Sequence, residues 1–330
     1  MLLNKIDCQL DDFMNYCQEK NLSIKTLTSY EQTLRLFVRY LYDTYKVIDV
    51  KDVKEDMIRN YIRYLQERGK YTITADEKTK MINFPDNRED YGKKLSTGTI
   101  NNYLRNIKVF FNFLVEFGEI RTNPAKKIKP LKQERKQIEF IDDEDLLKLL
   151  RYMDTTKFHE YRDYIIIQLL FDTGMRVGEC LAIQMDDIDF IGRAIRLEAE
   201  NTKGKKERYV FYSQHMSQEL RRWIDYKDRY VESDYLFCTK RGNPLRVEYF
   251  EKNFRQYGER VGLDVHPHML RHNFAKRCLM AGMDIYTLSR ILGHSSVTTT
   301  EKTYLQLINK DDLRKNYAKY SPLTRLKKRW

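Results

Sequence analysis

Two short segments and one tyrosine carry the most specific information in this sequence. Residues 266–272 read His-Pro-His-Met-Leu-Arg-His, residues 292–296 read Leu-Gly-His-Ser-Ser, and Tyr304 stands ten residues after the histidine of the second segment. The proline of the first segment suits the first position of a helix. His268 and Arg271, three residues apart, are then expected on one face near the positive end of that helix. The second segment is expected to close one helix at its glycine and to open another.

Two segments further upstream carry basic residues that suit phosphate binding. Residues 173–179 read Thr-Gly-Met-Arg-Val-Gly-Glu, and the first glycine is expected to end one helix before Arg176 begins another. Glu179 stands one helical turn later on the same face, where its carboxylate can orient the guanidinium. Lys203 is expected in the turn between two short strands, next to a glycine that permits close backbone approach. The two strands are expected at residues 194–199 and 208–212.

The chain lacks the usual sequence signatures of catalysis. It has no G-x-x-x-x-G-K-[ST] loop, no H-E-x-x-H, no G-x-S-x-G and no acidic cluster at metal-ligand spacing. Its five cysteines are odd in number and form no C-x-x-C pair, which predicts reduced thiols and neither a disulfide framework nor a zinc site. A basic chain of this kind can still act on a phosphate if its own side chains supply the positive charge. No metal and no cofactor are therefore expected.

The order arginine, lysine, His-x-x-Arg, Gly-His and tyrosine within one domain resembles the active site of the tyrosine recombinase family, also called phage integrases. It is similar to the Xer-type members, and the resemblance covers essentially the whole chain. It implies a mainly α fold with a small antiparallel β-sheet (α+β), in which a helical, SAM-like core-binding domain precedes a catalytic domain. It also implies a site-specific DNA recombinase that cleaves and rejoins strands through a 3′-phosphotyrosine and a Holliday junction, in mobile-element integration and excision or in multimer resolution.

The resemblance places six residues around the scissile phosphate: Arg176, Lys203, His268, Arg271, His294 and Tyr304. The two arginines would clamp the non-bridging oxygens, and the lysine would protonate the leaving 5′ hydroxyl. The first histidine would take part in proton transfer and contact the phosphate, while the second would donate a hydrogen bond to it. The tyrosine would be the nucleophile, and Glu179 would support the first arginine. His266 is expected to cap a loop, and His272 to serve packing or phosphate support.

The sequence divides into a helical first part, a basic linker and a mixed second part. The expected boundaries are residues 1–120, 121–137 and 138–330. Apolar residues recur at helical spacing in four stretches of the first part: residues 10–17, 27–41, 53–65 and 100–117. Further helices are expected after the linker at residues 142–153, 161–171 and 178–183. The polar stretch 69–94 has little periodicity and is expected to be a mobile or DNA-facing excursion, and residues 309–320 are expected to form a helix that packs onto a neighbouring subunit.

The balance of charge favours nucleic acid as the partner. The 330 residues include 60 Lys and Arg against 48 Asp and Glu, a formal charge of +12, and each phosphate that a protein neutralises releases condensed counterions. The linker holds two prolines among its basic residues and is expected to be extended along DNA. The lysines expected to contact the DNA backbone are Lys126, Lys127, Lys129, Lys132, Lys205 and Lys206.

The expected partner is double-stranded DNA with specific recombination sites, bound by a homotetramer on two duplexes, with accessory proteins as further partners. No apolar run approaches the ~20 residues of a bilayer span, and the N-terminus shows no apolar core of a secretion signal. A cytoplasmic, nucleoid-associated protein without a membrane partner is therefore expected. Two alternatives stay open: DNA relaxation like that of a type IB topoisomerase, and a DNA-binding architectural protein without catalysis.

Overall fold

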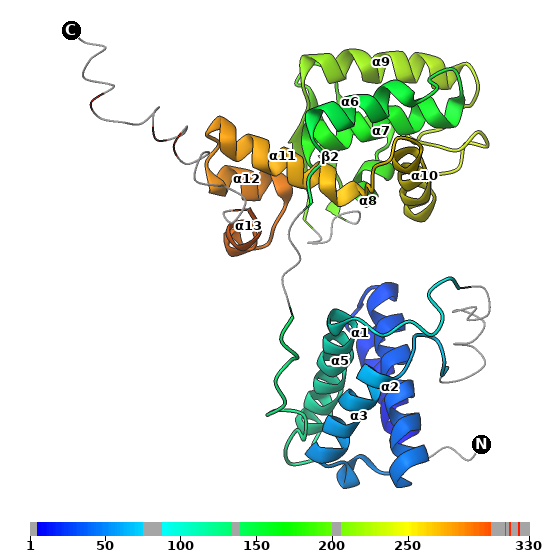
Figure 1. Ribbon diagram of the computed structural model, residues 1–330, viewed down its shortest axis with the longest axis vertical. Helices are drawn as coiled ribbons and strands as arrows, with labels where there is room; N and C mark the ends of the chain where they lie inside the picture. Colours follow the sequence, from blue (N-terminus) through cyan, green and yellow to red (C-terminus); the bar gives the residue numbers. More distant parts are fainter. Residues whose placement is uncertain are drawn as a thin grey trace. The chain divides into compact units, whose positions relative to one another are not determined.

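The computed structural model describes residues 5–74, 88–133, 139–199 and 206–304, together with the single positions 314, 317 and 323. The chain forms two compact units, residues 1–135 and residues 136–330 (Figure 1). Lys203 and Lys205 lie outside the described residues, as does the helix expected at residues 309–320 apart from positions 314 and 317. The domain limits inferred from the sequence stay a prediction. None of the described helices is both long enough and apolar enough to cross a membrane.

The described part of the first unit contains four α-helices, in the places where the apolar periodicity predicts them. They are α1 (Lys5–Glu19), α2 (Ile24–Tyr45), α3 (Glu55–Glu67) and α5 (Thr97–Glu116), with a short 3₁₀ turn η1 (Val50–Asp52) before α3. Ser23 and Ser96 begin α2 and α5, because each hydroxyl accepts a hydrogen bond from a backbone N–H of the first turn. The apolar faces meet in one core that buries aromatic rings from three helices: Phe13, Phe37, Phe110 and Phe111.

The irregular stretch between α3 and α5 has ends that are paired with each other. Gly69 and Lys94 form an isolated antiparallel bridge, and the backbone N–H of Lys70 donates to the carbonyl of Lys93 at 2.8 Å. A Cβ on Gly69 would lie 2.7 Å from the backbone of Gly92, so only glycine permits this approach. The stretch is therefore an excursion with a closed base. Residues 75–87 lie outside the described residues.

The second unit is larger and combines helices with one small sheet. Its α-helices are α6 (Asp143–Tyr152), α7 (Phe158–Thr173), α8 (Val177–Leu181), α9 (Gln214–Asp228), α10 (Val247–Arg260), α11 (Pro267–Ala281), α12 (Ile285–Leu292) and α13 (Val297–Tyr304). A 3₁₀ turn η3 (Met185–Asp187) leads into the strands β1 (Ile188–Asp189), β2 (Ala194–Leu197) and β3 (Arg208–Phe211). The mainly α fold with a small antiparallel sheet is thus confirmed.

The sheet corrects the sequence prediction in detail. Its strand order is β1-β2-β3, with both pairs antiparallel, whereas the sequence predicts only the second and third strands and makes each of them longer. The strand β1 is too short for alternation to be visible. Leu197, the last residue of β2, pairs with Arg208, the first residue of β3. The segment that contains Lys203 therefore connects the two strands of a β-hairpin.

Two apolar clusters fix the helices that surround the site. The helix α7 is buried on almost every side and contributes to the main core, which also holds the fully buried ring of Trp223 from α9. A second, smaller cluster joins α11, α12 and α13, and its members are Ala275, Leu279, Leu288, Leu292 and Tyr304. These three helices lie together at one end of the unit (Figure 1). The tyrosine of the sequence motif therefore belongs to a packed core.

Candidate active site

Arg176 lies at the corner between α7 and α8. Gly174 ends α7 with a φ of +65°, and a Cβ at this position would collide with the ring of Phe274. Arg176 then occupies the N-cap position of α8. Its backbone N–H donates to Oε2 of Glu179 at 2.8 Å, and its Nη1 donates to Oε1 at 2.8 Å. Glu179 thus holds both the backbone and the guanidinium of Arg176.

Arg208, the first residue of β3, completes this cluster and was not among the residues selected from the sequence. Its Nη1 and Nη2 donate to the two carboxylate oxygens of Glu179 at 2.9 and 2.6 Å. Burial alone would raise the pKa of Glu179, but the hydrogen bond and charge of Arg208, followed by those of Arg176, hold it below its usual value. Glu179 is therefore an anion shared by two arginines.

Arg271 reaches the same region from α11. Its Nη1 donates to the carbonyl of Gly174 at 2.7 Å, and its Nη2 donates to the carbonyl of Leu292 at 2.7 Å. Burial and the charge of Arg176 lower the pKa of Arg271 to about 10. Arg176 itself donates to the carbonyl of Gly293 at 3.4 Å. The two guanidiniums therefore meet at the turn between α12 and α13, where an anion would relieve their mutual repulsion.

His294 lies in that turn and is held at both ring nitrogens. Nη2 of Arg271 lies 3.0 Å from Nε2 of His294, and Nδ1 of His294 lies 2.7 Å from Oγ1 of Thr300. Because a guanidinium can only donate, Nε2 accepts and the ring proton resides on Nδ1. Burial and the charges of Arg271 and Arg176 lower the pKa of His294 to about 4. The imidazole is therefore neutral at pH 7 in the DNA-free chain.

Tyr304 ends α13 with its side chain 98% buried, since its exposed fraction is 2%. Its hydroxyl lies 3.3 Å from Nδ1 of His272, and its ring is nearly parallel to that of His294, with centroids 6.4 Å apart. Burial raises the pKa of Tyr304, while the charge of Arg271 and a hydrogen bond from it act in the opposite direction. The tyrosine thus packs between the histidines and faces the arginine cluster.

The remaining residues selected from the sequence differ in how they relate to this cluster. His268 begins α11 and is exposed, and its ring centroid lies 6.2 Å from that of His272. Lys203 lies outside the described residues. His266 stands at the N-cap of α11, but its side chain makes no capping hydrogen bond, so the cap expected from the sequence is wrong. His272 contacts Tyr304, a role more specific than the packing or phosphate support expected for it.

The predicted linker differs from an extended tether over its first half. Ala125 and Ile128 are buried in the core of the first unit, and the backbone N–H of Leu131 donates to Oδ1 of Asn101 at 2.8 Å. The lysines between and after these anchors are exposed: Lys126, Lys127, Lys129 and Lys132. Lys206, just before β3, is exposed as well. The packing of residues 125–131 therefore presents a row of cations on a fixed backbone.

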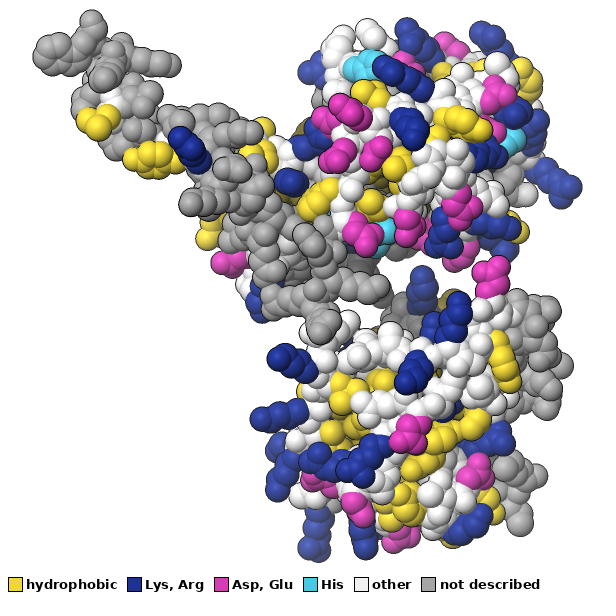
Figure 2. All heavy atoms as spheres, in the orientation of Figure 1, with side chains coloured by type: hydrophobic (Ala, Val, Ile, Leu, Met, Phe, Trp, Pro, Cys, Tyr) yellow, Lys and Arg dark blue, Asp and Glu magenta, His cyan; other side chains and the backbone are white. Residues whose placement is uncertain are grey.

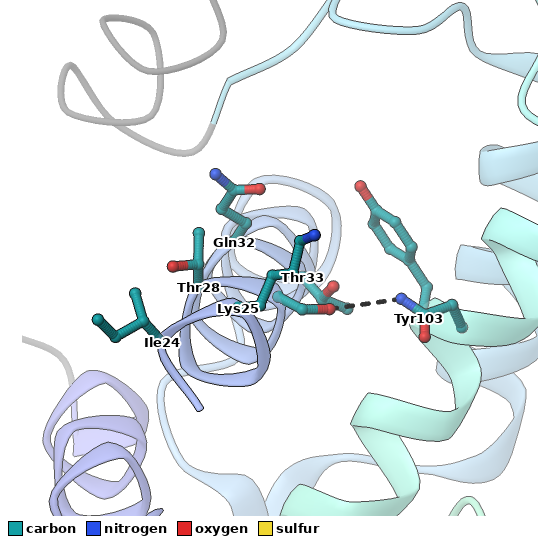
Figure 3. A pocket seen from close by; sticks show the side chains of 8 residues that line it. Ile24, Lys25, Thr28, Gln32, Thr33 and Tyr103 are labelled. Carbon is teal, nitrogen blue, oxygen red and sulfur yellow. Dashed lines mark hydrogen bonds between the residues drawn. The ribbon is translucent and has the colours of Figure 1, made fainter. Parts of the chain in front are cut away.

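A pocket lies on the first unit between the start of α2 and the start of α5. Figure 3 shows Lys25, Thr28 and Gln32 from α2 on one side and Tyr103 from α5 on the other. Asn102 Nδ2 donates to Oγ of Ser29 at 3.4 Å across it. The lining thus offers hydroxyl, amide and ammonium groups together.

Comparison with known proteins decides the family. The model described as "Phage integrase family" matches residues 139–310, and the model described as "Phage integrase, N-terminal SAM-like domain" matches residues 10–79. The chain belongs to the phage integrase family. The family's second, SAM-like model falls on the helical first unit. The resemblance inferred from the motifs is thereby confirmed, and with it the class of enzyme, a tyrosine-type site-specific DNA recombinase.

Relatives within the family cover nearly all of the chain. Tyrosine recombinase XerC of Bacillus subtilis (strain 168) is 28% identical over 302 residues, covering 88% of this chain and 96% of the relative. Tyrosine recombinase XerA of Saccharolobus solfataricus is 31% identical over 254 residues, covering 75% of this chain and 78% of the relative. Neither topoisomerase-like relaxation nor an architectural role is favoured by these relatives.

Solved structures show the same fold. The Tn1549 transposon integrase in complex with transposon right end DNA has a TM-score of 0.72 at 19% identity, covering 96% of this chain and 99% of that chain. The XerH site-specific recombinase bound to palindromic difH substrate has a TM-score of 0.67 at 22% identity, covering 94% of this chain and 84% of that chain.

Proposed function

We propose that Tyr304 attacks a scissile phosphate of DNA, forms a 3′-phosphotyrosine, and so cuts and rejoins strands at specific sites through a Holliday junction. The observation that carries this proposal is the meeting of Arg176, Arg271, His294 and Tyr304 around the turn between α12 and α13, although they span residues 176–304. A nucleophile beside two guanidiniums combines an attacking group with positive charge for the negative charge that develops on a phosphate.

The two guanidiniums stabilise the transition state. In-line attack spreads negative charge over the equatorial oxygens of the phosphate, and planar guanidiniums can bind these oxygens in bidentate fashion. In the DNA-free chain Arg271 donates to two backbone carbonyls and lies at Nε2 of His294, besides its hydrogen bond with Tyr304. A phosphate oxygen is a stronger, charged acceptor. When it replaces Nε2 as the acceptor for Arg271, His294 can take the other tautomer, in which Nδ1 accepts from the hydroxyl of Thr300 and Nε2–H donates to the same phosphate. His268 is proposed to contact the phosphate from the start of α11.

Lys203 is proposed as the general acid, by resemblance and by its place in the hairpin between β2 and β3. The leaving 5′ alkoxide is a poor leaving group at neutral pH, so an acid at this oxygen accelerates cleavage by roughly 10²–10⁴-fold. The phosphotyrosine retains the energy of the broken phosphodiester bond. Attack by a 5′ hydroxyl then reseals the strand without ATP.

DNA binding is proposed to use both units. Figure 2 shows Lys and Arg side chains spread over the visible face of both units among Asp and Glu. The lysines on the anchored segment, Lys126, Lys127, Lys129 and Lys132, suit phosphates, and Lys205 and Lys206 stand between β2 and β3 in the sequence. The pocket between α2 and α5 (Figure 3) offers the hydroxyl and amide groups that read base edges.

The assembled form is proposed to be a homotetramer on two duplexes, in the cytoplasm at the nucleoid, with accessory proteins as additional partners. Strand exchange between two sites needs four cleavages, and each chain carries one set of the clustered residues. Mobile-element integration or excision and multimer resolution share this chemistry.

A covalent-adduct assay tests the proposed function. The protein is incubated with a nicked or 5′-phosphorothiolate duplex, and a protein–DNA adduct is sought on a denaturing gel. Wild type should form the adduct, and Tyr304→Phe should not. Equal adduct from both proteins would overturn the role of Tyr304, and loss of the adduct in EDTA would reveal a metal-dependent mechanism. Relaxation of plasmids that lack paired sites would favour a topoisomerase.

A further inference from the structure

Thr300 connects His294 to the helix that carries the tyrosine. It lies on α13, its side chain is fully buried, and its Oγ1 lies 2.7 Å from Nδ1 of His294. Tyr304 follows four residues later, so the two side chains stand on the same face of α13. The ring of His294 meets both, because it also lies nearly parallel to the ring of Tyr304. One helix therefore carries the proposed nucleophile and the hydroxyl group that holds a proposed phosphate ligand.

The backbone of His294 is fixed, so the hydrogen bond with Thr300 decides how the ring is turned. The backbone N–H of His294 donates to the carbonyl of Ser289 at 3.1 Å, and Gly293, which ends α12, precedes it. The freedom that remains is rotation of the imidazole about its two side-chain bonds. In the DNA-free chain Nη2 of Arg271 lies at Nε2, but a phosphate that engages Arg271 would release this contact. Nδ1 keeps its contact with Thr300 when that happens.

A hydroxyl group suits this position because the neutral ring needs a partner at Nδ1 in both of its tautomers. While Arg271 donates to Nε2, the ring proton is on Nδ1 and Oγ1 of Thr300 accepts from it. For Nε2–H to donate to a phosphate oxygen, Nδ1 must accept, and the hydroxyl of Thr300 then donates. A carboxylate in this place could only accept and would keep the proton on Nδ1. Water exchanges the protons, because the ring of His294 is only half-buried: it takes one from Nδ1 and gives one to Nε2.

The charges around His294 keep its ring neutral, so the choice of tautomer matters. The ionisable groups that face the ring are Arg271 from α11, Arg176 at the start of α8, Arg208 from β3 and Tyr304 from α13. Burial, followed by the charges of the three arginines, lowers the pKa of His294 to about 4. At pH 7 the ring is therefore not an imidazolium, which would donate from both nitrogens. A neutral ring donates to a phosphate from Nε2 only while Nδ1 is held as an acceptor.

We propose that Thr300 is a positioning residue for DNA cleavage, whose hydroxyl orients His294 and lets its Nε2–H donate to the scissile phosphate. The proposal rests on the function proposed above. Thr300 acts through the imidazole and need not touch DNA, in keeping with its complete burial. Because it shares a face of α13 with Tyr304, the position of this one helix sets both the nucleophile and the orientation of His294.

Single-turnover cleavage of a nicked suicide duplex tests the proposal. Thr300→Val keeps the size and branching of the side chain but removes the hydroxyl, and it should slow cleavage by about 10–100-fold because Nδ1 loses its partner. Thr300→Ser keeps the hydroxyl and should cleave at close to the wild-type rate. Thr299→Val makes the same change at an exposed neighbour on α13 and should also cleave like the wild type. Gel-shift binding of uncleaved duplex shows that the variants fold and bind DNA, and Thr300→Ala replaces Thr300→Val if that variant fails this check.

A double variant separates a role through His294 from a role in packing. His294→Phe removes the proposed phosphate donor but keeps a flat ring beside Tyr304. If Thr300 acts through His294, Thr300→Val should cause no further loss in this background, whereas a packing defect would add to the loss. Methylphosphonates of defined configuration at the scissile position give a second readout. The loss caused by Thr300→Val should disappear on the diastereomer that lacks the oxygen bound by His294, and it should persist on the other diastereomer.

Other outcomes would overturn the assignment. Wild-type rates in both Thr300→Val and Thr300→Ala would show that the hydroxyl has no role in cleavage. Equal losses in Thr300→Val and Thr300→Ser would assign the effect to the packing of the side chain. Full additivity with His294→Phe, or an equal loss on both methylphosphonates, would mean that Thr300 acts on another part of the site. Failure of the proposed function looks different, because then the wild type itself forms no adduct.

Discussion

The guanidinium of Arg208 donates to both carboxylate oxygens of Glu179, at 2.9 and 2.6 Å, and Glu179 in turn holds the guanidinium of Arg176 at 2.8 Å. Arg208 also donates from Nε to the carbonyl of Ile291 at 3.2 Å. One side chain from β3 therefore connects the α7–α8 corner to the end of α12. The position of the proposed phosphate-binding arginine depends on a residue that need not touch DNA.

Replacement of Arg208 by Met should slow cleavage by about 10²-fold without abolishing DNA binding. Glu179 would keep Arg176 as its only cation, and a shift of about 1 Å in a positioned group is enough for a loss of this size. Single-turnover cleavage of a suicide duplex measures the effect. A methylphosphonate at the scissile position has a methyl group in place of one non-bridging oxygen and carries no charge, so it should reduce the defect if the lost element is the placement of Arg176.

Arg196→Met is the control for this variant. Arg196 lies on the neighbouring strand β2 and pairs with Asp187 at 3.0 Å, with 40% of its side chain exposed. It should cleave at close to the wild-type rate. Equal losses from both variants would mean that the sheet as a whole, and not the ion pair with Glu179, supports the site.

Gly293→Ala should impair activity by more than its cost in stability explains. Gly293 has a φ of +65°, and a Cβ there would lie 2.7 Å from the guanidinium of Arg208. Gly262 also has a positive φ, of +78°, but open space around its Cβ position. Both alanine variants should lose about 1–2 kcal/mol of unfolding free energy from backbone strain, whereas only Gly293→Ala should lose cleavage activity. Comparable cleavage by the two variants would show that Gly293 has no specific role in the site.

The sequence predicts the helices well, because caps and apolar periodicity act locally, and it selects the motif residues because they are distinctive in type. It misses Arg208 because a basic residue at the start of a strand has no local signal of its partner 29 residues away. It treats residues 121–137 as a tether because lysines and prolines dominate the composition. The apolar residues Ala125 and Ile128, three residues apart, indicate that this segment packs against the first unit. The overall composition of the segment does not show this.

The double variant Lys126→Ala/Lys127→Ala should weaken binding to all DNA sequences alike. These lysines lie between the buried anchors Ala125 and Ile128 and are exposed. Each lost phosphate contact should lower the slope of log K against log salt by about 0.9. Fluorescence anisotropy between 50 and 200 mM salt measures the slope. Lys20→Ala, which removes a lysine stacked on Tyr16 at the end of α1, should leave it unchanged; a loss confined to one DNA sequence would indicate base contacts instead.

Two half-buried histidines predict how the stability of the second unit depends on pH. The pKa values of His272 and His294 are each lowered to about 4, chiefly by burial, while both would titrate near 6.5 in the unfolded chain. Between these values the unfolded state binds more protons than the folded state, so the free energy of unfolding falls as the pH drops from about 6.5 to about 4 and is unaffected by these groups above that window. Urea unfolding followed by the fluorescence of buried Trp223, in a Trp330→Phe background, measures it at successive pH values. His272→Asn should flatten the dependence in this window, and His159→Gln, at a side chain that is 54% exposed, should not. An unchanged slope in His272→Asn would mean that His272 gains its proton as easily in the folded chain as in the unfolded one, against the burial that places it beside Tyr304.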